Sequence, residues 1–321
     1  MDSPTPSPIQ SGPVPAGAGD LSLPAGLLLL AAALVFFTLG TVAQLSDLAS
    51  GLFVTQLVCF LLPAVLFARA SNTRARSYLR WDRGLGWGEL ALVLLVSLAN
   101  YFVAAALMGV CTQLLPESWR FADAARVLAA TEGPQLSAIV IAVVVLAPFC
   151  EEALFRGALQ RGFTARLGPR RAILLTALAF SALHADPIGF LPRVELGLLF
   201  GWLAWRTRSL AAPILAHAVN NGAATLLFFA AGVETEPERE APLGLLLGVM
   251  AVGLVVLLPA LKGLHHVAPP LPEQAEPPAR LDEGRPIALR PDSLELSILG
   301  VLVFLALGIF VLFVAARAGA L

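Results

Sequence analysis

Charged residues are scarce in this sequence of 321 residues. Asp, Glu, Lys and Arg together make up only 13% of the chain, whereas 58% of its residues are hydrophobic. Soluble domains contain about one quarter charged residues, so the composition excludes a soluble fold and indicates a multi-pass membrane protein. The formal net charge is −1, which gives no support for nucleic-acid binding and leaves the lipid bilayer as the expected surroundings.

Lysine and cysteine are also nearly absent. Lys262 is the single lysine among 21 basic residues. Together with the abundant Ala, Leu, Gly and Pro, this composition is typical of a GC-rich bacterial genome, so we expect the bacterial cytoplasmic (inner) membrane. The three cysteines, Cys59, Cys111 and Cys150, lie in apolar runs with no CxxC spacing. They indicate small apolar packing residues and no disulfide.

No lysine or arginine occurs in residues 1–22, which are rich in Pro, Ser, Gly and Ala. A signal peptide needs a positive n-region, so we expect a disordered tail followed by an uncleaved first span. Long apolar runs then predict an all-α polytopic transmembrane helical bundle of about eight to nine spans. The predicted spans are about 23–45, 52–68, 88–115, 136–160, 171–185, 193–205, 210–231, 243–261 and 296–316.

The spans and the stretches between them predict six regions. Residues 116–135 contain Trp119 and several charges, which favours a segment lying along the membrane interface. Residues after the eighth span are rich in Pro and charge, which is typical of a flexible linker. The predicted regions are a tail (1–22), N-terminal helices with the interfacial segment (23–135), a core (136–231), the eighth span (232–263), a Pro-rich cytoplasmic linker (264–295) and a C-terminal transmembrane helix (296–321).

Arginine is distributed unevenly between the connections. With nine spans, fifteen of the basic residues fall on one side of the membrane and five on the other, with Arg156 inside it. Cytoplasmic loops carry the excess of Lys and Arg. We therefore expect a cytoplasmic N-terminus and a C-terminus outside. The basic side comprises the connections 69–83, 161–171, 206–208 and 262–290.

Two adjacent carboxylates, Glu151 and Glu152, close the apolar run of the fourth span, and Arg156 follows them. One centrally placed charge costs a transmembrane helix roughly 2.5–3.5 kcal/mol, and such residues mark functional sites. Glu152 and Arg156 are four residues apart, which predicts an ion pair on one helix face. Glu151 is turned by about 100° from Glu152, so we expect it to be the carboxylate that meets water.

Two of the four histidines lie within other apolar runs and are the expected partners of these carboxylates. They are His184 in the fifth span and His217 in the seventh. Asn221 is four residues after His217 and shares its helix face, whereas Asn220 is expected to point elsewhere. The other two histidines, His265 and His266, follow the eighth span and read as interfacial residues.

A carboxylate, two imidazoles and an amide around a wet cavity suit hydrolysis. The carboxylate would take a proton from water with the help of one histidine, and the other histidine and Asn221 would hold the developing oxyanion. Alternatively, Glu151, His184 and His217 could bind Zn²⁺ as a His₂Glu set with an open position, although the HExxH signature is absent. Two further alternatives are a non-catalytic immunity or scaffold factor and a proton-coupled transporter.

The motifs resemble a known family, the CPBP intramembrane proteases. This group, also called the Abi family, includes the type II CAAX prenyl endopeptidases and bacteriocin-processing proteins. The resemblance covers about residues 136–231. It is carried by Glu151-Glu152-x-x-x-Arg156, Phe180-x-x-x-His184 and His217-x-x-x-Asn221, in this order and each on its own span.

The resemblance implies a helical-bundle endopeptidase acting on a membrane-anchored or secreted-precursor protein or peptide. By position, Glu151 would activate water with His184, and His217 with Asn221 would stabilise the oxyanion. Glu152 and Arg156 would orient the site. The family has been described both as metal-dependent and as glutamate-type. We favour the glutamate type without a cofactor, because an amide suits an oxyanion site better than a zinc shell.

Overall fold

The computed structural model describes residues 22–70, 75–119, 131–230 and 241–268, and it contains no strand in these ranges. The predicted all-α helical fold is therefore confirmed. The α-helices are α1 (Ser22–Val35), α2 (Thr41–Ser46), α3 (Leu48–Val54), α4 (Leu62–Ala70), α5 (Ala75–Tyr78), α6 (Trp87–Leu114), α8 (Gly133–Ile141), α9 (Ala147–Glu152), α10 (Gln160–Leu183), α11 (Phe190–Thr207), α12 (Ala211–Ala230) and α13 (Leu243–Val267).

Four wide π-helical turns join several of these helices into longer rods. They are η1 (Phe36–Gly40), η2 (Thr55–Leu61), η4 (Ala142–Leu146) and η5 (Ala153–Leu159). A short 3₁₀ turn, η3 (Glu117–Trp119), follows α6. Turns of the π type occur often at functional sites, and η4 and η5 flank the short helix α9 that ends at Glu152.

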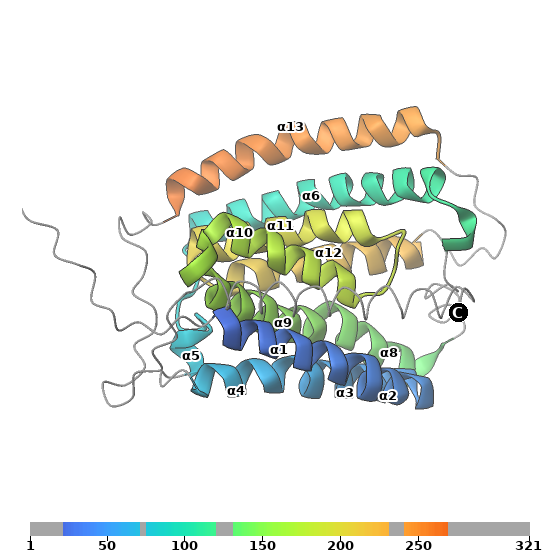
Figure 1. The fold of residues 1–321 in the computed structure, drawn as a ribbon. Helices are drawn as coiled ribbons and strands as arrows, with labels where there is room; N and C mark the ends of the chain where they lie inside the picture. The colour runs from blue at the N-terminus through green and yellow to red at the C-terminus, as the bar shows by residue number, and fades with distance from the viewer. Residues whose placement is uncertain (1–21, 71–74, 120–130, 231–240, 269–321) are drawn as a thin grey trace, which may run out of the picture.

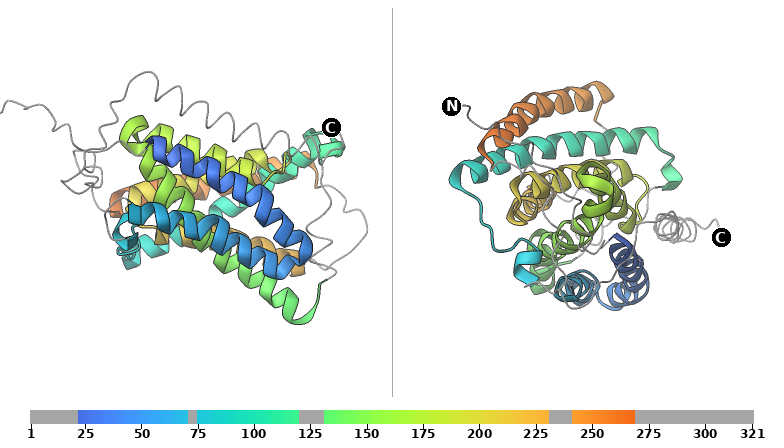
Figure 2. Two further views of the ribbon diagram at one scale, coloured as in Figure 1. Left: turned by 60° about the horizontal axis from the view of Figure 1, so that its bottom comes forward. Right: turned by 60° about the vertical axis from the view of Figure 1, so that its left-hand side comes forward.

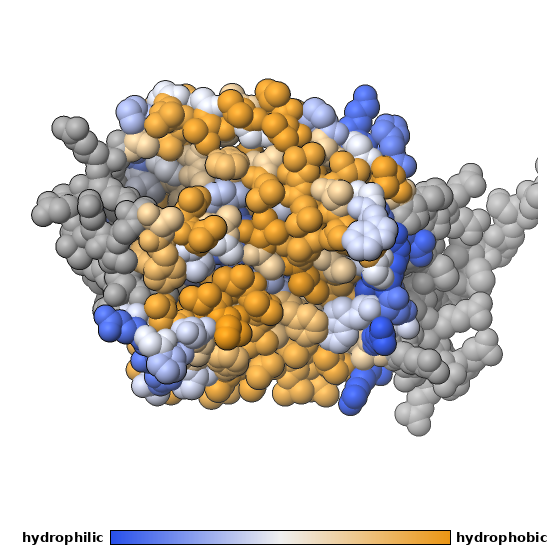
Figure 3. All heavy atoms as spheres, turned by 180° about the vertical axis from the view of Figure 1, so that it is seen from behind, coloured by the Kyte–Doolittle hydropathy of each residue, from blue (hydrophilic) through white to orange (hydrophobic). Residues whose placement is uncertain are grey.

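The helices run side by side along one direction (Figure 1). α13 packs along α6 at one side of the bundle, and the rods formed by α1 to α4 lie at the opposite side (Figures 1 and 2). α9 to α12 lie between these two layers. Apolar side chains form a broad belt around the bundle, and hydrophilic residues gather toward its ends (Figure 3). This is the surface of a multi-pass membrane protein.

Six helical rods in the described residues are long and apolar enough to cross a membrane. The predicted count of eight to nine spans is not confirmed. α10 and α11 stand where the fifth and sixth spans were predicted, but they are absent from this set of six. The predicted ninth span, 296–316, lies outside the described residues. The six rods are Ala25–Ser46, Leu48–Arg69, Trp87–Leu114, Gly133–Thr164, Ala211–Ala230 and Leu243–Val267.

α11 carries charged residues because protein groups, rather than lipid, satisfy them. Glu195 accepts a hydrogen bond from the Asn100 amide of α6 at 3.2 Å. Arg206 is buried and donates to the carbonyl of Ala268 at 3.0 Å. Polar groups in a membrane helix are tolerated where they face such partners. A helix surrounded by protein can therefore be shorter and more polar than one that faces lipid.

The fourth rod and the following helix are separated by a sharp change of direction inside α10. Gly168 has φ 73° and ψ 165°, and Pro169 follows it. A positive φ favours glycine because it has no Cβ, and proline cannot continue the hydrogen-bond ladder. This bend divides the predicted fourth span from the predicted fifth.

Two other helix ends are fixed by specific hydrogen bonds. Asp47 is extended between α2 and α3, and its carboxylate accepts from the Ser50 hydroxyl at 2.6 Å and the Ser50 backbone N–H at 2.8 Å. These hydrogen bonds lower the pKa of Asp47. At the other end of the chain, α13 continues to Val267, beyond the predicted span end at 261 and into the predicted linker, because Leu264 is buried and Arg206 binds the carbonyl of His265.

The arginine-rich connections meet at one end of the bundle, which we call the basic end. It comprises residues 69–70, 75–86, 161–171, 206–210 and 262–268, which lie at the same ends of their helices. Arg80 donates to the carbonyl of Ala204 at 3.3 Å and accepts a hydrogen bond from the Leu210 backbone N–H. Arg83 binds the carbonyl of Thr207. Hydrogen bonds thus join residues 80–83 to residues 204–210 at this end of the bundle.

Candidate active site

A cavity of about 640 Å³ lies inside the bundle, between the rods formed by α2 to α4, α6 and α8 to α12. Its walls are mainly apolar. Four of the six predicted site residues line it, and the other two, Glu152 and Arg156, are buried in contact with lining residues. The polar residues of the lining are Gln44, Thr55, Gln56, Tyr101, Glu151, His184, Arg193, His217, Asn220, Asn221 and Thr225.

Glu152 is the centre of a buried charged network. Its Oε1 atom accepts from Nη1 of Arg156 at 2.9 Å and lies 2.9 Å from Nδ1 of His217. The ion pair predicted between Glu152 and Arg156 is therefore present, and both side chains are completely buried. Arg156 also donates through Nη2 to the carbonyl of Gly197 at 3.0 Å. The network ties η5 and α9 to α11 and α12.

Three aromatic rings surround the Arg156 guanidinium. Its central carbon lies 4.7 Å from the centroid of the Phe180 ring, 5.4 Å from Phe200 and 5.7 Å from Phe155. Such cation–π contacts are stronger when the cation is shielded from water. The arginine is therefore held on one side by a carboxylate and on the other by ring faces and edges, which suits a fixed structural charge rather than a group that moves.

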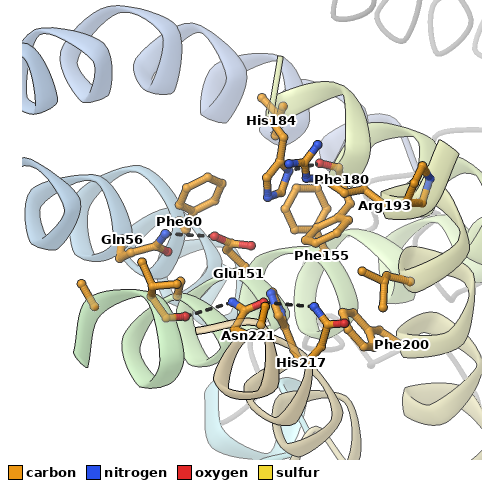
Figure 4. A pocket seen from close by; sticks show the side chains of 18 of the residues that line it. Gln56, Phe60, Glu151, Phe155, Phe180, His184, Arg193, Phe200, His217 and Asn221 are labelled. Carbon is orange, nitrogen blue, oxygen red and sulfur yellow. Dashed lines mark hydrogen bonds between the residues drawn. The ribbon is translucent and has the colours of Figure 1, made fainter. Parts of the chain in front are cut away.

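Glu151 has a different environment from its neighbour. It is 6% exposed, and its Oε1 atom accepts a hydrogen bond from Nε2 of Gln56 at 2.9 Å (Figure 4). Its Oε2 atom is buried and has no hydrogen-bond partner. A buried polar oxygen normally has a partner, so an orphan atom in a lining residue marks a place where water or substrate can bind.

His184 ends α10 beside the cavity. Its Nδ1 atom lies 2.8 Å from the carbonyl oxygen of Phe180. A carbonyl oxygen can only accept, so Nδ1 carries the proton and Nε2 of the neutral ring is an acceptor. Arg193 lies close to this ring (Figure 4) and is paired with Asp186 at 2.7 Å. The side chain of His184 is accessible within the open cavity.

His217 is held in the same tautomer by a different partner. The carboxylate of Glu152 accepts from Nδ1, which leaves Nε2 of the neutral ring as an acceptor. The ring also stacks on Phe200, with centroids 4.9 Å apart and planes inclined by 21°. These two contacts fix the ring orientation. The fixed imidazole can accept a proton on Nε2, and the adjacent carboxylate would offset the resulting charge.

Asn221 lies one helical turn after His217 and lines the same cavity. One N–H of its amide donates to the carbonyl of Val143 in η4 at 2.9 Å. Its Oδ1 atom accepts from the Asn220 amide at 3.3 Å. The expectation that Asn220 points away was wrong, because Asn220 also lines the cavity and packs beside Asn221. The second N–H of Asn221 is left for another acceptor.

Gln56 was missed at the sequence level. It lies in η2, and 95 positions separate it from Glu151, the residue that it contacts. It is buried to 5% exposure. An amide within an apolar span also serves as a common interhelical hydrogen bond, so the sequence marks Gln56 as unusual without naming its partner. A search for every polar residue inside the predicted spans would have found it.

Glu151, His184 and His217 were also predicted as an alternative zinc set. The described residues contain no group of three or more His, Cys, Asp or Glu side chains placed to hold a metal ion. The three side chains as they stand do not fit a His₂Glu site, in which all ligands lie about 2 Å from the metal.

Comparison with known proteins finds a family match for one part of the chain. Residues 133–223 match the family model described as type II CAAX prenyl endopeptidase Rce1-like. This segment is Rce1-like. The match agrees with the predicted resemblance to the CPBP and CAAX proteases, and over this segment it supports a CAAX-type intramembrane protease in general. The Rce1-like segment contains all six predicted site residues but not Gln56. No curated protein and no solved structure matched the chain.

Proposed function

We propose that this protein is an intramembrane endopeptidase in which Glu151 acts as a general base on water. The carboxylate takes a proton from a water molecule, and the hydroxide adds to the carbonyl carbon of the scissile peptide bond. The C–N bond then breaks. The proton held by Glu151 passes to the leaving amine, so that one water is divided between the new carboxyl and amino ends.

One observation carries this proposal: two adjacent buried carboxylates have different partners. Glu152 is bound by Arg156 and His217, whereas Glu151 receives one amide hydrogen bond. The Oε2 atom has no partner in either residue, but only Glu151 lines the cavity. A carboxylate engaged by an arginine is a poor base, because proton uptake would break the ion pair. The less engaged carboxylate, which lines the cavity, is the better one.

The two histidines take different roles in this proposal. The neutral ring of His184 accepts a hydrogen bond from the attacking water through Nε2, beside a positively charged Arg193. His217 lies against the Glu152 carboxylate, which would offset a proton on Nε2. The ring takes a proton on Nε2 from solvent before the attack and keeps it through the cycle, so that this N–H and the second N–H of Asn221 donate to the oxyanion of the tetrahedral intermediate. Glu152 and Arg156 hold this arrangement without touching the substrate.

The proposal is tested by cleavage of a membrane-anchored substrate in proteoliposomes. Glu151→Ala, His184→Ala and His217→Ala should each reduce the rate by about 10²-fold or more, since each removes a proton-transfer or oxyanion group. The readout is the amount of cleaved product per folded enzyme, and Gly248→Ala is the control, because a Cβ at Gly248 meets no other atom within 4 Å. Undiminished activity in any of the three variants would sink the assignment.

The same assay decides whether a metal takes part. The glutamate-type mechanism predicts full activity after dialysis against a strong chelator and no metal in stoichiometric amount in the active protein. Loss of activity on chelation, with recovery on addition of Zn²⁺, would replace this mechanism with the zinc-dependent version.

Gln56 is a positioning residue in this proposal, because its amide fixes the Glu151 carboxylate. Gln56→Leu should lower kcat by about 10–100-fold, since a small misplacement of a catalytic group can cost about 10²-fold. The KM should change by less than about two-fold, because leucine is close to glutamine in size and the other residues of the cavity wall are unaltered. Steady-state kinetics on the folded fraction measure both constants.

Gln160 provides a matched control for Gln56. Both side chains are 5% exposed, both donate one amide hydrogen bond at 2.9 Å, and both leave Oε1 without a partner. Gln160 donates to the backbone carbonyl of Gly201 and does not line the cavity. Gln160→Leu should therefore lose stability with kcat unchanged. Equal losses of kcat in the two variants would show that Gln56 has only a structural role.

A further inference from the structure

The cavity reaches the site from one end of the bundle. Its lining includes residues close to the ends of their helices opposite the basic end. Gln44 lies three positions before Asp47, His184 ends α10, and Arg193 lies in the first turn of α11. These positions mark the mouth of the cavity. Glu151, Phe155 and Phe200 lie deeper, toward the middle of the bundle.

A dry layer closes the cavity toward the basic end. Leu79, Leu159, Leu203 and Leu210 are each at most 2% exposed and belong to one apolar core. They come from the connection after α5, from η5, from α11 and from the start of α12. Phe163 is completely buried in the same core. No residue of the arginine-rich connections lines the described cavity. Water and substrate therefore reach Glu151 from the opposite end.

The distribution of basic residues indicates which side of the membrane the mouth of the cavity faces. Cytoplasmic connections carry the excess of Lys and Arg, and the described basic residues are concentrated at the basic end. Arg193, at the mouth, is held in an ion pair by Asp186. The positive-inside rule thus assigns the basic end to the cytoplasm and the mouth of the cavity to the outer side. The basic-end residues are Arg69, Arg76, Arg80, Arg83, Arg161, Arg170, Arg171, Arg206, Arg208 and Lys262.

We propose that the substrates are exported proteins whose membrane anchor is cut in the outer half of the bilayer. This inference rests on the proposed function and adds the side and the class of substrate. A cytoplasmic protein with a lipidated C-terminal tail, as the family description suggests, would meet the closed end of the cavity. The mouth would instead receive a chain that has already crossed the membrane, at the junction between its anchor and its outer domain.

The walls favour an apolar, extended segment at this junction. Phe36, Leu52, Phe60, Tyr101 and Met108 line the cavity. Among the described residues of the lining, the only Asp, Glu, Lys or Arg side chains are Glu151 and Arg193, and Arg193 is paired with Asp186. An acidic or basic substrate segment would lose its hydration there without gaining a partner, which is costly. An apolar segment would bury its side chains favourably.

The first part of the test labels the two ends in intact cells. Ser46→Cys and Ser77→Cys are matched conservative changes at exposed positions, the first next to the mouth and the second at the basic end. The three natural cysteines are buried, so the unaltered protein gives the background. A membrane-impermeant maleimide should label Ser46→Cys in intact cells, and Ser77→Cys only after lysis. The reverse pattern would overturn the inference, whatever the protein cleaves.

The second part uses two reporters that share one apolar junction and one transmembrane anchor, inserted in opposite orientations. Wild-type protein should cut the reporter with an outward junction at least ten-fold faster than its inverted counterpart, and Glu151→Gln should cut neither. Preferential cutting of the inward junction would overturn the inference. If neither reporter is cut while labelling is outward, the proposed proteolysis and its substrate class fail, but the outward mouth is established independently.

Discussion

Replacing Glu151 with Gln should reduce the cleavage rate by about 10²–10⁴-fold, the range that a positioned general base contributes. The change preserves the size of the side chain, and the new amide oxygen can still accept from Gln56. Only the ability to take a proton from water is lost. We therefore expect a folded protein with an intact cavity and no base. Single-turnover cleavage in proteoliposomes measures the chemical step directly.

The neighbouring carboxylate provides the contrast. Glu152→Gln should lower thermal stability as well as activity, because it leaves Arg156 buried beside a neutral amide. Glu151→Gln should leave the unfolding temperature unchanged or raised, because it removes a buried charge that has a single amide partner. Thermal unfolding in detergent, measured beside the cleavage assay, separates the two. If Glu151→Gln retained activity and Glu152→Gln abolished it without loss of stability, the two roles would be reversed.

Replacing Arg156 with Met should destabilise the protein by about 3–5 kcal/mol, the cost of breaking a buried ion pair by removing one partner. The change leaves Glu152 as an uncompensated buried charge. It also frees the carbonyl of Gly197 and removes the contacts with three aromatic rings. Reversible unfolding in a detergent–denaturant series measures the free energy of unfolding.

A double-mutant cycle identifies the cause of this loss. Glu152→Gln combined with Arg156→Met should recover part of the stability, because neither charge is then buried alone, and the two effects should be strongly non-additive. Arg170→Met is the surface control at an exposed arginine, where a change within about 0.5 kcal/mol is expected. Additive losses in the cycle would show that Glu152 and Arg156 are not coupled and that the destabilisation comes from lost packing.

The local parts of the site could be predicted from sequence because helix geometry fixes them. Glu152 and Arg156 are one turn apart, and so are His217 and Asn221. Glu152 does pair with Arg156, and His217 and Asn221 do line one cavity. Asn220 shows the limit of this argument. One position away from Asn221 it should face elsewhere, yet a cavity between several helices collects residues from a wide arc.

Contacts between distant segments could not be predicted in the same way. Gln56 meets Glu151 only because η2 packs against α9, and hydrophobic periodicity does not encode which apolar helices become neighbours. The wide turns η2, η4 and η5 could not be predicted either, because their sequences are mainly apolar and do not differ from those of ordinary membrane helices. The partner of His217 was likewise open, because either carboxylate lay within plausible reach.

The predicted count of eight to nine spans is not confirmed, and α11 shows a physical reason for the difference. Hydropathy detects helices that face lipid, and α11 is mostly surrounded by α6, α10 and α12. Its charged residues are satisfied by Asn100, Ala268 and Asp186, so its composition approaches that of a soluble helix. The all-α class is less sensitive to this problem, because long apolar runs in a bilayer can form only helices or closed barrels.

The dry layer formed by Leu79, Leu159, Leu203 and Leu210 has a consequence for the energy balance of the cell. Hydrolysis within a bilayer requires water far from the surface, and a continuous file of water would conduct protons down the transmembrane voltage. Under the proposed mechanism, water would enter the cavity from one end only and stop at side chains that are at most 2% exposed. The cavity could therefore hold water while the membrane remains electrically insulating.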